Sequence, residues 1–165
     1  SLKNWSIKAK KIKILIKKGE NMKDDLEIIK QIYKDADMSI ASLTTLLTDL
    51  EDKDNKIKGT IKNIKEGYQR YKDMAQKILK KEKVELESNS FMTKMMANMG
   101  IKKEVKSDNS DASIADMLIK GILMGETDID KKLKSFEKID KKVEKMATDF
   151  KEFQEDNIKA LKEHL

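Results

Sequence analysis

The chain has 165 residues, of which 40% are charged, and it contains no Cys and no Pro. A chain of this length suits one domain with a single hydrophobic core. The absence of Cys excludes disulfide bonds and thiolate metal sites. No run approaches the ~20 apolar residues of a membrane span, and we find no secretory leader, so we expect a cytoplasmic protein without a membrane span.

The net charge of +6 is concentrated at the start of the chain. Residues 1–21 hold seven lysines and one glutamate, whereas residues 22–165 hold 29 basic and 29 acidic side chains. A neutral body gives no reason to expect nucleic-acid binding outside the basic segment. We therefore divide the chain into a basic leader, residues 1–21, and a single domain, residues 22–165.

The basic leader has two interpretations. Lys18, Gly19, Glu20 and Asn21 can be encoded by a purine-rich ribosome-binding sequence just before Met22, which would make the leader translated upstream sequence outside the native protein. Alternatively, the leader is a basic arm that binds a membrane surface or nucleic acid through its lysines and a crude apolar face. That face consists of Ile7, Ile12, Leu15 and Ile16.

Apolar residues at alternating spacings of three and four predict a first helix over about residues 23–50. The polar run that follows offers caps and a short turn, which implies an antiparallel return. The predicted seam of this helix is Leu26, Ile29, Tyr33, Ala36, Ile40, Leu43, Leu47 and Leu50, widened by Ile32 and Leu46.

A second helix is predicted over about residues 54–87, although its apolar stripe drifts after Ile78. Gly59 and Gly67 lie inside this helix, and we interpret them as places where a neighbouring backbone or a tyrosine ring approaches closely. The predicted seam is Ile57, Ile61, Ile64, Tyr68, Tyr71, Ala75 and Ile78.

The helical pattern breaks over residues 88–111, where we expect a long connection with one short helix ended by Gly100. A methionine-rich strip in this connection is our candidate partner-binding surface, because methionine side chains adapt to different partners. The alternative is a lid that covers the bundle, since large exposed apolar patches are rare on monomers. The strip consists of Phe91, Met92, Met95, Met96 and Met99.

Two more helices are predicted over about residues 112–136 and 140–163. A Ser/Asp-rich region caps the first of them, and the connection between them is short and lacks Gly and Pro. The alternative is one helix over residues 113–165, which we reject because its length would match no partner helix. The seams are Ile114, Leu118, Ile122, Gly125, Ile129, Leu133 and Phe136, and then Val143, Met146, Phe150, Phe153, Asn157 and Leu161.

The predicted layout, with short first and third connections and a long second one, resembles the ferritin-like four-helix superfamily, in which the long link is a crossover. Residues 114–125 are also similar to small bacterial members of that superfamily without assigned activity. We therefore expect an all-α, antiparallel four-helix bundle. The sequence leaves open whether the helices run up-down-up-down or with a crossover.

The resemblance implies a di-metal site built from carboxylates and two Glu-x-x-His motifs. Glu66 is followed by Gln69 where the ligand His should stand, and the single His, His164, is the second-last residue. Both ligand histidines are therefore missing, and we expect no metal, no cofactor and no catalytic residue. The carboxylates that remain near mid-helix positions are Asp37, Glu126, Glu152 and Glu155.

We expect a non-enzymatic structural or protein-interaction module that binds a protein partner or a second copy of itself. The alternative is a metal-storage or oxidoreductase relative that uses carboxylate ligands alone. A second alternative is membrane-surface or nucleic-acid binding through the leader. The interior is expected to be apolar, and Gly121 and Gly125 are expected to let another helix approach closely.

Overall fold

The computed structural model describes Asn4, residues 22–86 and residues 108–165. The two long described ranges contain four helices and no strand, which confirms the predicted all-α fold. The helices are α2 (Met22–Asp49), α3 (Lys58–Lys81), α5 (Asp111–Ser135) and α6 (Lys141–Lys162).

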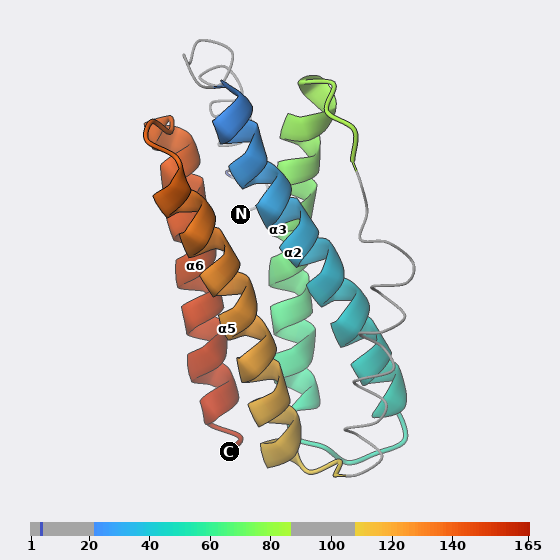
Figure 1. Cartoon of the computed structure of the whole chain (residues 1–165). Helices are drawn as coiled ribbons and strands as arrows, with labels where there is room; N and C mark the ends of the chain where they lie inside the picture. Colours follow the sequence, from blue (N-terminus) through green and yellow to red (C-terminus); the bar gives the residue numbers. More distant parts are fainter. Residues whose placement is uncertain (1–3, 5–21, 87–107) are drawn as a thin grey trace.

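The direction of the helices answers the question that the sequence left open. Figure 1 shows α2 and α6 running one way along the bundle, and α3 and α5 running the other way. Because α3 and α5 are parallel, residues 82–110 connect opposite ends of the bundle. The most extensive packing lies within the antiparallel pairs α2–α3 and α5–α6, so the bundle consists of two helical hairpins placed side by side.

The predicted seams form most of the core, because residues spaced by three and four share one helix face. Ile29, Ala36 and Leu46 of α2 are fully buried. Four aromatic rings join α3 to α6: Tyr68 and Tyr71 each pack against Phe150 and Phe153, with ring centroids 4.9–6.0 Å apart. These rings therefore form an aromatic cluster between the two hairpins.

The predicted limits of α3 were wrong at both ends. The helix begins at Lys58 rather than at residue 54, because the Asn55 amide donates to the Asn109 carbonyl and to Asp111 Oδ1, both at 2.8 Å. It ends at Lys81 rather than at residue 87, where Lys83 takes a left-handed backbone conformation with φ 56°. Both ends depend on local bends or long-range contacts that helical periodicity does not report.

Residues 136–140 separate α5 from α6, so the prediction of two helices is confirmed and the single-helix alternative is wrong. The Ser110 hydroxyl accepts from the Ser113 N–H at 3.2 Å at the start of α5, as the Ser/Asp-rich region predicted. Asp140 caps α6 by accepting from the Lys142 N–H at 2.7 Å. Asp25 of α2 in turn accepts from the Asp140 N–H at 2.9 Å, which ties the two hairpins together.

Candidate functional site: an apolar groove on a charge-poor face

The methionine-rich strip that we predicted as the partner-binding surface lies outside the described residues. The prediction about Phe91, Met92, Met95, Met96 and Met99 therefore stays a prediction. The site described below comes from other residues.

The carboxylates considered for a metal site do not gather in one place. Asp37 is buried and forms an ion pair with Lys72 at 3.0 Å, and Glu66 and Glu152 are exposed. Glu126 of α5 and Glu155 of α6 do come together, and burial and the neighbouring Glu155 raise the pKa of Glu126. Within residues 22–86 and 108–165, no three His, Cys, Asp or Glu side chains are placed to hold a metal ion.

The interior is less apolar than expected, because a carboxyl group and an amide are buried between α2, α5 and α6. Asp35 and Gln154 are only 5% and 1% exposed. The Gln31 amide donates to Asp35 Oδ1 at 2.9 Å, whereas Asp35 Oδ2 and Gln154 Oε1 have no hydrogen-bond partner in the described structure. Burial is the main reason that the pKa of Asp35 rises to about 7.

The Tyr68 hydroxyl extends this polar group toward the surface. It is hydrogen-bonded to the side chains of Gln154 and Ser39, and burial raises the pKa of Tyr68 to about 12. The phenol therefore stays neutral at physiological pH and contributes a hydroxyl dipole rather than a charge. Ser39 lies one helical turn from Asp35, at the inner edge of the groove described next.

The two glycines of α5 have different environments. A Cβ on Gly125 would lie 3.2 Å from Gln154 Nε2 and 3.5 Å from Asp35 Oδ2, so the absence of a side chain makes room for the buried polar group. A Cβ on Gly121 would meet nothing within 4 Å. The expectation of close helix approach therefore fails at Gly121, which instead borders open space.

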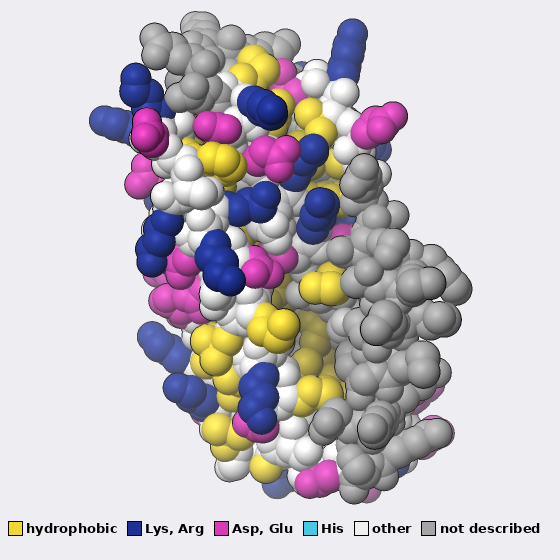
Figure 2. All heavy atoms as spheres, in the orientation of Figure 1, with side chains coloured by type: hydrophobic (Ala, Val, Ile, Leu, Met, Phe, Trp, Pro, Cys, Tyr) yellow, Lys and Arg dark blue, Asp and Glu magenta, His cyan; other side chains and the backbone are white. Residues whose placement is uncertain are grey.

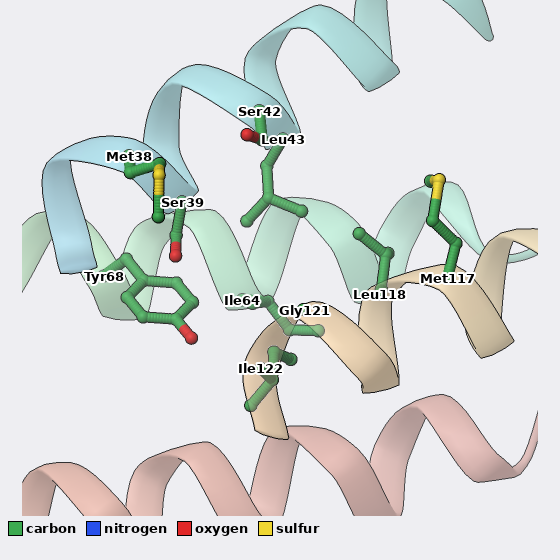
Figure 3. Close-up of a pocket in the computed structure, with 10 residues that line it drawn as sticks. All are labelled: Met38, Ser39, Ser42, Leu43, Ile64, Tyr68, Met117, Leu118, Gly121 and Ile122. Atoms are coloured by element: carbon green, nitrogen blue, oxygen red, sulfur yellow. The ribbon is translucent and has the colours of Figure 1, made fainter. Parts of the chain in front are cut away.

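That open space is a groove of about 230 Å³ between α2, α3 and α5, which we call the α2–α5 groove. Figure 3 shows Leu43 of α2 and Leu118 of α5 pointing toward each other across it, with the Tyr68 ring at one end. Its lining is mainly aliphatic and contributes few polar groups. The lining residues are Met38, Ser39, Ser42, Leu43, Ile64, Tyr68, Met117, Leu118, Gly121 and Ile122.

The segments of α2 and α5 on either side of the groove carry very few charges. Residues 38–48 of α2 contain no charged side chain, although the chain as a whole is 40% charged. Residues 112–125 of α5 contain only Asp116 and Lys120, which neutralise each other in an ion pair of 2.7 Å. We call these two segments, with the α2–α5 groove between them, the charge-poor face.

Two large apolar side chains of α5 are exposed; Met124 lies beside the groove, whereas Leu123, two residues after Gly121, points to another side of the helix. Met124 is 70% exposed and Leu123 is 47% exposed, and Leu165 is the other large hydrophobic residue exposed among the described residues. Met124 follows Gly121 by three residues and Met117 by seven, so the three share one edge of α5. Figure 2 shows hydrophobic side chains gathered on the lower half of this face, over α5 and the recess beside it.

His164 is held against α3. Its Nε2 lies 2.9 Å from the Thr60 hydroxyl, so the end of the chain is tied to the first turn of α3. The contact is with one neutral hydroxyl, and it gives no reason to assign a catalytic role to the imidazole.

Comparisons with protein-family models, with curated proteins and with solved structures find no match to this chain. None of the described helices combines the length and apolar character that crossing a membrane requires.

Sequence reasoning missed both the groove and the buried Asp35. The charge-free run over residues 38–48 was visible in the sequence and could have identified the face, since interface cores are depleted of charged residues. The groove could not be found in the same way, because it depends on how far α2 and α5 stand apart.

Proposed function

We propose that this chain is a non-catalytic protein-interaction module that binds a protein partner on the charge-poor face. Apolar side chains of the partner would occupy the α2–α5 groove. The observation that carries the proposal is the pairing of this unfilled groove with the exposed Met124 beside it on an otherwise heavily charged protein. Apolar surface of this kind on a soluble protein marks a binding site.

The size of the groove favours a protein partner over a small molecule. Pockets for small ligands have volumes of about 300–1,000 Å³ and enclose most of the ligand. The groove of about 230 Å³ is smaller and open, and its apolar rim continues along α5 to Met124. Anchor side chains from a helix fit such a groove, because they project at intervals of three and four residues.

The direction of the helices also supports our proposal that the fold is ferritin-like, because parallel α3 and α5 require the long crossover typical of that superfamily. The carboxylate metal site of active members has no counterpart among the described residues. We therefore prefer an interaction module to metal storage.

The proposal can be tested with a partner that is first captured and then measured. Proteins from the native cell are retained on the immobilised full-length chain, and each candidate is purified and titrated against it. Met124→Glu places a charge on the face, and Gly121→Leu fills the groove without an initial steric clash. Asn63→Glu is the matched control, because Asn63 is exposed on α3, away from the face.

We expect both face variants to weaken binding at least tenfold, which corresponds to about 1.4 kcal/mol. The Asn63→Glu control should change the dissociation constant less than twofold. If every partner binds the Met124→Glu and Gly121→Leu variants as tightly as the unmodified chain, the proposal is wrong. Circular dichroism of each variant separates lost binding from lost folding.

A further inference from the structure

We infer that the partner on the charge-poor face is a second copy of this chain, and that Met124 of each copy enters the α2–α5 groove of the other. This inference rests on the proposed function, and it names the occupant of the same site. The result is a two-fold symmetric dimer in which each copy contributes the same surface.

The charge-poor face carries both a protruding side chain and a groove to receive it. Met124 is 70% exposed, while Gly121, on the same edge of α5, borders empty space. A cavity of about 150 Å³ lined by aliphatic and aromatic residues holds a molecule the size of benzene. The groove of about 230 Å³ therefore has room for a methionine side chain.

Met124 and the α2–α5 groove are also placed as a two-fold dimer requires. In a two-fold dimer every contact occurs twice: if Met124 of the first copy enters the groove of the second, Met124 of the second copy enters the groove of the first. The protruding residue and the groove must then lie close together on one face. Met124 lies three residues after Gly121 and seven after Met117, on the edge of α5 that borders the groove, which satisfies this condition.

The low charge of this face also favours a second copy as the partner. When a face meets its own copy, every net charge on it meets the same charge, and like charges in an interface are unfavourable. The exposed parts of α3 are unsuitable, because Lys58–Lys81 contains eight basic and two acidic residues. The charge-poor face has no such repulsion, since Asp116 and Lys120 are already paired.

The size of the face sets the expected affinity. The charge-free run of α2 and the segment of α5 facing it are about 16 and 21 Å long, from 1.5 Å per residue. With helices about 10 Å wide, two such stretches side by side cover about 400 Å² per copy, less than the roughly 800 Å² per partner of a standard stable interface. We therefore expect a reversible dimer, with an average mass that rises with concentration from 19.0 kDa toward twice that value.

The test is sedimentation equilibrium of the full chain over micromolar to millimolar concentrations. We expect the unmodified chain and Asn63→Glu to dimerise, and Met124→Glu and Gly121→Leu to remain monomeric. A dimer that persists in Met124→Glu would overturn the inference, since the interface would then lie elsewhere, for example on residues 87–107.

Crosslinking provides an independent measurement, because the chain has no cysteine of its own. Ser42→Cys, in the groove, is mixed with an affinity-tagged Thr127→Cys, one turn beyond Met124, and treated with a short bis-maleimide. We expect a mixed product from this pair and at least tenfold less when Asn63→Cys replaces Ser42→Cys. Equal yields from both pairs would contradict the inference.

The failure of this inference is distinguishable from the failure of the proposed function. A chain that stays monomeric at millimolar concentration overturns the dimer. If another protein then binds in a way that Met124→Glu and Gly121→Leu abolish, the proposed function stands. If no protein, including a second copy, depends on the face, both proposals fall.

Discussion

Replacing Asp35 with asparagine is expected to stabilise the protein, although Asp35 is buried. In the folded state burial raises the pKa of Asp35 from 3.8 to about 7. At a pH between these two values, Asp35 keeps its proton in the folded protein but has released it in the unfolded chain. Raising the pH from about 4 to about 7 therefore lowers the free energy of unfolding, and the loss of stability is complete above about pH 7.

The size of this effect on the free energy of unfolding follows from the difference between the two pKa values. Each unit of pKa difference corresponds to about 1.4 kcal/mol, so ionisation of Asp35 costs about 4 kcal/mol of unfolding free energy at pH 8. The side chain introduced by Asp35→Asn would carry no charge at any pH. Its oxygen would still accept from Gln31, as Asp35 Oδ1 does at 2.9 Å, and its amide would place a donor where Asp35 Oδ2 now has no partner.

The assay is urea unfolding, followed by far-UV circular dichroism, of the unmodified chain and Asp35→Asn from pH 5 to pH 8. We expect the stability advantage of the variant to grow by about 3 kcal/mol over this range, since the window closes near pH 7. Asp73→Asn is the control, because it removes a carboxylate from an exposed position of α3. An advantage that does not change with pH, or a variant less stable at pH 8, would refute this reasoning.

Three further substitutions test the packing. Gly67→Ala should destabilise the protein by about 1–2 kcal/mol in urea unfolding, because its Cβ would clash with the Phe153 ring. This overpacking exceeds the gain in helix propensity, and an unchanged unfolding midpoint would show that the ring moves freely. Gly121→Ala should stabilise by up to about 1 kcal/mol, since its Cβ meets nothing within 4 Å, and a loss of stability would mean that this space is already filled. Asp25→Ala should cost about 1–3 kcal/mol, because the Asp140 N–H loses its acceptor; equal thermal stability of variant and unmodified chain would contradict this.

The helices could be predicted from the sequence wherever periodicity determines them. In α2 the stripe placed the helix to within a residue at each end, because an apolar face must be buried whatever it packs against. The ends of α3 were not predictable in this way. Asn55 meets Asp111, which is 56 positions later in the chain, and only the folded bundle brings the two together.

At Gly67 the predicted close approach of a neighbour was correct, but the neighbour was misidentified. A close approach was expected, and the ring that approaches belongs to Phe153 of α6 rather than to a tyrosine. Gly59 was given the same interpretation, yet a Cβ there would meet nothing within 4 Å. A glycine in a helix therefore does not itself reveal whether it makes room for a neighbour.

The sequence by itself determined the all-α class, the four apolar faces and the charge-free run of α2, because these depend on the order and spacing of side chains along each helix. The tertiary structure alone decided that α3 and α5 are parallel, that Asp35 and Gln154 are enclosed together, and that a groove remains between α2 and α5. The physical reason is that burial and empty space are properties of the distance between helices. That distance is set by the side chains of all the helices that meet, and the pattern of any one helix does not contain it.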